Sequence, residues 1–444
     1  MNTSAPTISR LSTADSDFEM KLGQHLQRDM LVADAVSQSV ADIIADVRQR
    51  GDQAVVDYSN RFDGFDVSSM AELTISQDQL ERALDALPAS QRQALVHAAE
   101  RIRRYHDKQK QVSWHYEEPD GSVYGQKVSP LERVGVYAPG GKANYPSSIL
   151  MQAIPAQVAG VKEIVATVPT RFGEAGYLVF AAAALAGVNR LYTIGGAQAV
   201  AALAYGTESI PRVDKITGPG NSYVTMAKKQ VFGDVGIDML AGPSELTIIC
   251  DGKTDPDWIA MDLFSQAEHD EQAQSILIST DQAFLDQVQQ SIDRLLPDME
   301  RREIIWQSLS SRGIFIYAED AEKAAVASNL IAPEHLEISV EDPDAMLDYI
   351  DHAGAIFLGR HTAEALGDYC AGPSHVLPTS GSARFFSALG VYDFQKRSSI
   401  INCSPAGASK LAGTAAELAR NERLQAHALS AEYRIDPNLG PENK

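Results

Sequence analysis

The sequence is poor in cysteine and lacks any long hydrophobic run. Its three cysteines, Cys250, Cys370 and Cys403, lie far apart with no CxxC pair, which argues against a disulfide framework and a thiolate zinc cluster. The longest apolar run, residues 177–188, is too short to cross a bilayer. Residues 1–17 are polar and lack the apolar core of a secretory signal. Together these absences predict a cytoplasmic protein with no membrane segment.

Positive charge is also scarce. The 38 lysines and arginines are outnumbered by 59 aspartates and glutamates, which gives a net charge of −21. This balance argues against a general surface for nucleic acid or for anionic membranes. A chain of 444 residues, 44% hydrophobic and 22% charged, is ordinary for a soluble globular protein and long enough for two or more domains.

Strand and helix patterns alternate regularly along the middle of the chain. A first series of strands separated by helices is expected at 134–137, 164–168, 191–194 and 213–217. A second series begins at 246–250 and continues to 355–358. Regular alternation of this kind is typical of parallel sheets covered by helices. The sequence therefore predicts an α/β protein with two Rossmann-like parallel-sheet lobes, a helical N-terminal segment and an extended C-terminal tail.

The domain boundaries follow from these two series. We expect an N-terminal extension over 1–31, one α/β lobe from 32–133 plus 244–389, an inserted lobe over 134–243, and a tail over 390–444. The tail has helical spacing from 408 to 432 but no expected sheet of its own. Such a tail is suited to packing on a partner subunit.

The stretch from Asp262 to His269 reads as a helix with metal-binding side chains. Gln266 and His269 are three residues apart, so on a helix they project from one face. Zinc accepts mixed nitrogen and oxygen ligands, but two ligands do not close a site. Further acid and histidine clusters lie at 332–336, 367–375 and 422–427. The alternative for the isolated pair is a solvated helix face without a function.

Glycine-rich turns follow three of the expected strands, at 138–141, 195–198 and 218–221. The sequence has neither GxGxxG nor a P-loop at these turns, because Ala143 follows Gly140-Gly141-Lys142. Ligands of open α/β sheets bind at the carboxyl ends of the strands, where backbone N–H groups can meet a pyrophosphate. Each turn alone could serve only chain reversal, but three on one edge favour a bound ligand.

These segments together resemble histidinol dehydrogenases, the zinc enzymes that complete histidine biosynthesis. The matching stretches occur in the family's order and span about residues 32–427; they are 134–141, 195–199, 218–221, 236–245, 262–269, 332–336, 367–379 and 393–397.

The resemblance implies zinc, NAD and a homodimer with shared active sites. By position, it implies these zinc ligands: Gln266, His269, Asp368 and His427, the last from the other subunit. It implies that Ser244, His375 and Glu422 hold the substrate, with Glu422 also donated across the dimer, and that the zinc ligands and His335 contact it as well. The implied NAD contacts are Tyr137, Gln198 and Asn221. Cys370 has no role in this scheme.

The implied reaction oxidises L-histidinol through L-histidinal to L-histidine, with one hydride transferred to NAD in each step. The resemblance makes Glu334 and His335 the acid–base pair. An imidazole titrates near neutral pH, so His335 can take the hydroxyl proton, while Glu334 can activate the water that adds to the aldehyde. Zinc would orient the substrate amine and imidazole. Because neighbours on a strand point to opposite faces, the pair is expected on a loop or helix start, as Pro333 also suggests.

Other readings remain open from the residues alone. A relative with the same zinc and NAD frame could oxidise another small alcohol, such as a sulfonated diol. A two-lobed solute-binding protein could close on a ligand without chemistry. Cys370 or Cys403 could act as a nucleophile, although neither has an obvious base beside it. Glu422 and His427 are five residues apart and do not share an ideal helix face, so their joint role rests on the resemblance.

Overall fold

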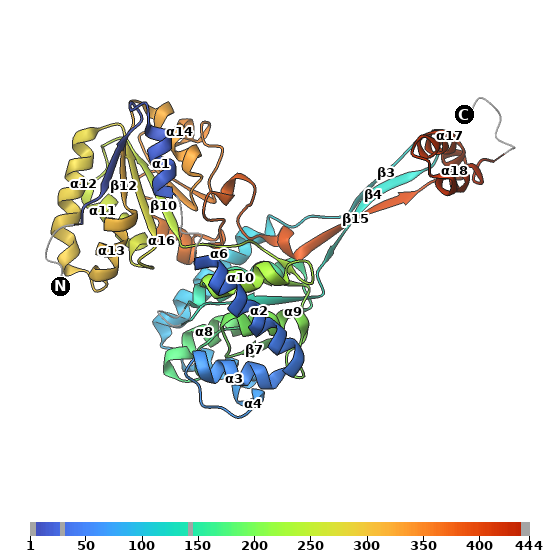
Figure 1. The fold of residues 1–444 in the computed structure, drawn as a ribbon, viewed down its shortest axis with the longest axis horizontal. Helices are drawn as coiled ribbons and strands as arrows, with labels where there is room; N and C mark the ends of the chain where they lie inside the picture. Colours follow the sequence, from blue (N-terminus) through green and yellow to red (C-terminus); the bar gives the residue numbers. More distant parts are fainter. Residues whose placement is uncertain (1–5, 27–31, 141–144, 437–444) are drawn as a thin grey trace. The chain divides into compact units, whose positions relative to one another are not determined.

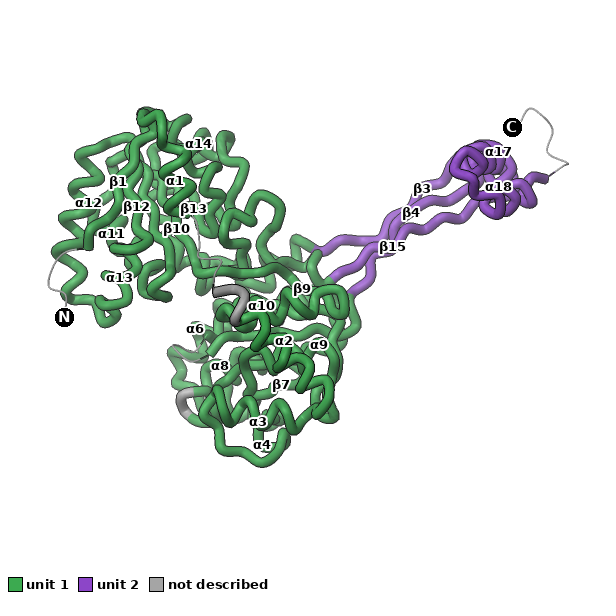
Figure 2. Tube along the Cα trace, in the orientation of Figure 1, with its two compact units in different colours: residues 1–109, 131–394 green, residues 110–130, 395–444 purple. Residues whose placement is uncertain are grey.

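The chain divides into two compact units (Figure 2). The first contains residues 1–109 and 131–394, and the second contains 110–130 and 395–444. The computed structural model describes residues 6–26, 32–140 and 145–436. Gly141, the last residue of the first expected glycine turn, lies outside the described residues. The first unit carries two α/β lobes, each built on a sheet of parallel strands, so this part of the predicted fold is confirmed.

The first sheet has the strand order β2-β7-β6-β5-β8-β9. The strands are β2 (Thr74–Ile75), β5 (Arg133–Tyr137), β6 (Glu163–Thr167), β7 (Arg190–Tyr192), β8 (Lys215–Thr217) and β9 (Gly236–Ile237). Only β2 runs antiparallel to its neighbour. α7 (Pro146–Ala159) and α8 (Glu174–Leu185) share one core with the sheet, and α9 (Gly196–Tyr205) and α10 (Ser222–Val231) share the other. Beyond their first residues, the central strands β5, β6 and β8 are buried because helices cover both faces.

The helices that precede this sheet pack on it (Figure 1). α2 (Val32–Arg50) and α3 (Asp52–Phe62) join the core of α9 and α10, together with α4 (Met70–Leu73). α5 (Gln77–Ala86) and α6 (Ala89–Asp107) join the core of α7 and α8. This packing differs from the expected grouping of 32–133 with 244–389. Helical periodicity shows that a face is buried, but it does not show which sheet covers that face.

The second sheet is parallel throughout, with the order β1-β12-β11-β10-β13-β14. Its strands are β1 (Ser9–Ser12), β10 (Glu245–Cys250), β11 (Gln274–Ser279), β12 (Ile314–Tyr317), β13 (His335–Ser339) and β14 (Ala355–Leu358). One face is covered by α11 (Pro256–Ala267), α12 (Gln282–Leu295) and α13 (Arg302–Arg312). The other is covered by α1 (Phe18–Leu26), α14 (Ala321–Ile331) and α15 (Pro343–Leu347). The expected N-terminal extension therefore supplies an edge strand and a helix to this lobe.

Both sheets contain a point where the strand order reverses. In the first sheet it lies between β5 and β8, and in the second between β10 and β13. Short helical turns complete the unit at Leu296–Asp298, Glu364–Leu366 (α16), Gly367–Ala371, Ser382–Arg384 and Val391–Phe394. No helix among the described residues combines the length and the apolar composition needed to cross a membrane.

The second unit is a three-stranded antiparallel sheet with a helix pair. β3 (Trp114–Glu117), β4 (Val123–Pro130) and β15 (Gln395–Asn402) pair in the order β15-β4-β3, and α17 (Pro405–Asn421) packs on α18 (Gln425–Glu432). The prediction that the tail has no sheet of its own was wrong. The partner of β15 lies far away in the sequence, so a local pattern could not reveal the pairing.

Candidate active site

Most of the expected chemistry gathers at the amino ends of the second sheet's strands. Ser244 immediately precedes β10, and Glu334 immediately precedes β13, whose first residue is His335. Gln266 lies in the last turn of α11, and His269 follows that helix. The helix ends at Ala267, so the expectation that His269 continues the helical face is corrected. The His269 amide instead donates to the Gln266 carbonyl across 3.2 Å in the turn that follows.

The two peptide groups of Glu245 hold the Glu334–His335 pair. Its N–H donates to Glu334 Oε2 across 2.9 Å, and its carbonyl lies 3.0 Å from His335 Nδ1. A carbonyl oxygen only accepts, so Nδ1 carries a proton, and in the neutral imidazole the lone pair lies on Nε2. The expectation of a loop or a helix start is correct for Glu334 and wrong for His335, which begins a strand. Pro333 and the paired strand β10 fix this junction.

Three carboxylates surround the buried imidazole of His335. Its Nδ1 lies 3.7 Å from Glu334 and 3.5 Å from Glu364, and its Nε2 lies 3.4 Å from Asp368 Oδ1. Burial alone would lower the pKa of His335, but Glu364 and Glu334 outweigh burial and raise it well above its usual range. The carboxylates are therefore arranged to stabilise an imidazolium.

The neighbouring carboxyl groups hold protons more tightly than usual. Burial raises the pKa of Glu334 to about 8, against the opposing effect of His335. Burial likewise raises the pKa of Glu364 to about 8. A buried carboxyl with such a pKa can exchange a proton near neutral pH, as a general acid or base must.

Gln266 has a buried side chain that could serve as a metal ligand. Its side chain is fully buried, and within the described part of the chain neither its amide oxygen nor its nitrogen has a hydrogen-bond partner. A buried amide in this state is costly unless another group satisfies it. The nearby His269 has a lowered pKa, chiefly because of burial, which favours the neutral imidazole that metals bind.

Asp368 connects this pair to the acid–base residues. It lies in a turn of π-helix, Gly367–Ala371, a form that often occurs at functional sites. Burial would raise the pKa of Asp368, but the imidazoles of His335, His375 and His269 outweigh burial and lower it. In the described residues, ligand atoms of His335, Glu364 and Asp368 lie within 4.8 Å of one another. This cluster shares only Asp368 with the expected zinc ligands.

His375 joins the two lobes at this site. Its Nδ1 lies 3.0 Å from the Asp368 carbonyl and therefore donates, which leaves Nε2 to accept from Ser148 Oγ at 3.3 Å. Ser148 lies in the first turn of α7, directly beyond β5. The carboxyl end of β5 is thereby brought next to the amino edge of the second sheet.

The three expected NAD contacts lie at carboxyl ends of the first sheet. The hydroxyl of Tyr137, at the end of β5, accepts from the Gly196 amide across 3.1 Å. Gln198 lies in the first turn of α9, and Asn221 caps α10 by accepting from the amides of Tyr223 and Val224. Two of these side chains therefore also have structural roles.

Gly218 shows how closely the chain approaches itself here. Its φ is +113°, and a Cβ at this position would lie 2.0 Å from the Tyr137 carbonyl oxygen. The buried pair Lys228–Asp238 fixes the turn, because Lys228 donates to the Gly218 carbonyl and Asp238 accepts from the Gly218 amide. A glycine turn beside a reversal of strand order is the usual setting for a dinucleotide.

Glu422 and His427 are not among the residues that the first unit brings together. Glu422 ends α17, and His427 lies on α18, both in the second unit and both exposed. Between them, Arg423 has a φ of +64°, which breaks the helix into two.

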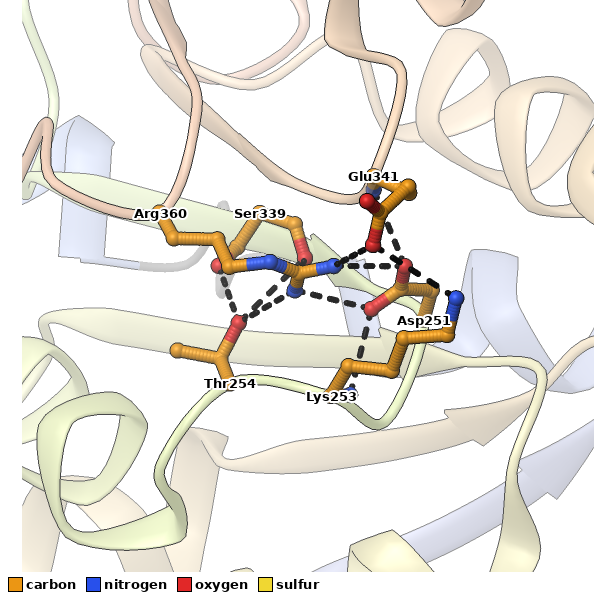
Figure 3. A network of polar contacts seen from close by, with 6 residues as sticks. All are labelled: Asp251, Lys253, Thr254, Ser339, Glu341 and Arg360. Atoms are coloured by element: carbon orange, nitrogen blue, oxygen red, sulfur yellow. Dashed lines mark hydrogen bonds and ion pairs between the residues drawn. The ribbon is translucent and has the colours of Figure 1, made fainter.

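The carboxyl edge of the second sheet is closed by side chains (Figure 3). Arg360 pairs with Asp251 through two contacts of 2.8 Å, and it also bonds Thr254 and the Ser339 carbonyl. This bidentate pair lies beside the strand reversal between β10 and β13. A ligand site would be expected at that edge, but the convergent acid–base groups of this lobe lie at the opposite edge.

The sequence-based reasoning missed Glu364, Glu245 and Ser148. Glu364 could have been found, because it lies four residues before Asp368, a spacing that suits one helix face. Glu245 acts through its backbone, which no side-chain pattern reveals. Ser148 is brought to His375 only by the meeting of the two lobes.

Comparison with known proteins points to one family. The family model for histidinol dehydrogenase matches residues 26–435. A histidinol dehydrogenase of Pseudomonas aeruginosa is 65% identical over 428 residues, covering 96% of this chain and 97% of that protein. One from Dechloromonas aromatica is 60% identical over 429 residues, covering 97% and 99% respectively. The crystal structure of histidinol dehydrogenase from Elizabethkingia anophelis aligns with a TM-score of 0.90 at 33% identity, covering 97% of this chain and 99% of that one.

Proposed function

The chain belongs to the histidinol dehydrogenase family and is an oxidoreductase, and from this premise we propose that it converts L-histidinol through L-histidinal to L-histidine with zinc and NAD. The observation that carries the proposal is the buried Glu334–His335 pair, oriented by the two peptide groups of Glu245. The Nε2 of His335 lies 3.4 Å from Oδ1 of Asp368, one of the expected zinc ligands.

Zinc is proposed to be held by Gln266, His269 and Asp368, with His427 from a partner subunit. The unsatisfied amide of Gln266 and the neutral imidazole of His269 fit this role. When bound, zinc would fix the amine and imidazole of the substrate, and NAD would accept one hydride in each oxidation. Ser244, which immediately precedes β10, and His375, which contacts the Asp368 carbonyl, are proposed to bind the substrate, with Glu422 of a partner subunit.

The proton transfers are assigned to the chain's own residues. In its neutral form, His335 accepts the hydroxyl proton at Nε2 in the first oxidation, while Nδ1 stays hydrogen-bonded to the Glu245 carbonyl. Glu364 and Glu334 stabilise the imidazolium that results. Glu334, once ionised, takes a proton from the water that adds to the aldehyde. His335 then serves again as base for the hydrate.

A homodimer is proposed because the second unit has little core of its own. Its buried hydrophobic cluster consists of three alanines, Ala416, Ala419 and Ala428. Trp114, Ile401, Leu418 and Tyr433 are each more than half exposed. A second copy of the chain that covers these side chains would bury them in an isologous interface, and it would bring His427 and Glu422 to a neighbouring active site.

The stoichiometry of the reaction tests the proposed function. The purified enzyme with zinc, L-histidinol and excess NAD should form two NADH for each histidine, with little free histidinal. The same assay with other amino alcohols and with sulfonated diols sets the substrate class. One NADH per turnover with accumulated aldehyde would contradict the proposal.

A further inference from the structure

We propose that Asp63 is a specificity residue of the dinucleotide site, whose carboxylate disfavours a cofactor that carries a 2′-phosphate. The inference rests on the proposed NAD-linked function and adds to it a reason for choosing between two cofactors. Asp63 follows α3 and reaches the turn between β7 and α9. It comes from the helical segment before the first sheet rather than from the sheet itself.

The contacts of Asp63 place it among the expected cofactor-binding groups. Its Oδ2 lies 3.4 Å from Gln198 Nε2, and the Gly195 amide also hydrogen-bonds its carboxyl. Gly196, the next residue, donates to the hydroxyl of Tyr137. The carboxylate thus contacts the same turn as Tyr137 and Gln198, two of the three side chains that we propose to contact NAD.

The charge of Asp63 is not cancelled by a cation in the described part of the chain. Arg171, a nearby base, donates to the Gly64 carbonyl and lies over the Phe65 ring, 5.1 Å from its centre. No ion pair joins Asp63 to a lysine or an arginine of residues 6–26, 32–140 or 145–436. Burial raises the pKa of Asp63 to about 6, so the group is ionised at pH 8. A part-buried, uncompensated carboxylate is costly, which suggests a use beyond stability.

The topology indicates which half of the cofactor meets this charge. The contact between His375 and Ser148 places the reaction site beyond β5 and the start of α7. Asp63 and Gln198 follow β7, which is separated from β5 by β6. Neighbouring strands lie about 4.8 Å apart, so Asp63 and Gln198 are displaced across the sheet by about 10 Å from the reacting centre. The nicotinamide must reach that centre, so the adenosine half extends toward Asp63.

A carboxylate at this position is compatible with ribose hydroxyls, because it can accept hydrogen bonds from them. A phosphate on the same ribose would bring a second negative charge close to Asp63 in a partly buried site, where repulsion is weakly screened. The exclusion of the phosphorylated dinucleotide then follows from charge rather than from shape.

The experiment compares Asp63→Asn with Asp66→Asn in the zinc-loaded full-length enzyme. Both changes remove one negative charge, and Asp66 is an exposed residue three positions along the chain. With L-histidinol at pH 8, Asp63→Asn should raise the ratio of kcat/KM for NADP to that for NAD by about tenfold or more, equivalent to about 1.4 kcal/mol. Asp66→Asn should leave the ratio at the parent value.

The ratio separates selectivity from damage, because a disturbed fold lowers both activities together. Direct binding of NADP measured by calorimetry provides a second readout that does not depend on turnover. If the parent reduces NAD but Asp63→Asn gains neither NADP turnover nor NADP binding, the specificity role is overturned while the proposed function stands. If the parent fails to reduce NAD, the proposed function itself is lost.

Discussion

At the scale of single residues, the backbone of Glu245 organises the chemistry. One peptide N–H fixes a glutamate oxygen and the adjoining carbonyl fixes a histidine nitrogen. The positions of Glu334 and His335 therefore depend on the junction of β10 and β13 rather than on side-chain packing alone. Family resemblance predicted the pair from the sequence, but it could not reveal that the backbone of Glu245 fixes Nδ1 of His335 as a hydrogen-bond donor.

Substitutions at the pair should separate the two oxidations. Glu334→Gln keeps an oxygen that can accept from Glu245 but removes the carboxylate base, so histidinal oxidation should fall by about 100-fold. Interconversion of histidinol and histidinal should fall much less. His335→Asn removes the proton acceptor of both steps and should lower both by about 100-fold or more. Rapid-mixing assays started from each substrate measure the two steps, and parent-like activity of His335→Asn would rule out its role.

His106 should make the stability of the first unit sensitive to acid. It is fully buried on α6, and its pKa is lowered chiefly by burial. The unfolded chain therefore binds the proton more readily, so stability is complete above the unfolded pKa of about 6.5 and is lost as pH falls below it.

Between pH 6.5 and 5.5, protonation of His106 in the unfolded chain should lower the free energy of unfolding by up to about 1.4 kcal/mol. His106→Gln should flatten that slope in urea titrations, whatever its effect at pH 8. His97→Gln, at an exposed position of the same helix, is the matched control. An unchanged slope in His106→Gln would show that other groups set the acid sensitivity.

At the scale of elements, the sequence predicted individual strands and helices but missed the contacts between segments that are far apart in the chain. Alternating strand and helix patterns revealed both parallel sheets, because most of their strands follow one another after a single helix. The same patterns did not show that α2, α3, α5 and α6 cover the first sheet, or that β1 joins the second. Nor did they reveal the pairing of β15 with β4, because its register connects segments that are far apart in the sequence. The partners of an element are set by the whole fold.

Substitutions of Asn221 test whether one side chain both caps a helix and contacts the cofactor. Its side chain accepts from two amides at the start of α10, at 3.1 and 3.2 Å. Asn221→Ala should lose about 1 kcal/mol of stability together with NAD affinity. Asn221→Ser retains a capping oxygen but not the amide, so it should unfold like the parent while its KM for NAD rises. A parent-like KM in Asn221→Ser would remove this residue from the cofactor site.

At the scale of the whole molecule, the proposed active site combines opposite sheet edges of the two lobes. The first offers carboxyl ends with glycine turns, and the second offers amino ends with titrating side chains, connected by the contact of Ser148 with His375. At the other edge of the second sheet, Arg360 and Asp251 form an ion pair. Of the four zinc ligands that we propose, three belong to the first unit, and the fourth, His427, belongs to the second.

Subunit exchange decides where His427 acts. Gln266→Ala and His427→Ala should each bind zinc poorly and be inactive alone, because each removes one ligand from every site. If His427 serves the partner, a mixed dimer has one site with both lesions and one with neither. Random reassembly makes about half of the molecules mixed, so activity should return to roughly a quarter of the parent value. Zinc content should recover in parallel. If His427 served its own subunit, every site would keep one lesion, and verified exchange would restore neither zinc nor activity.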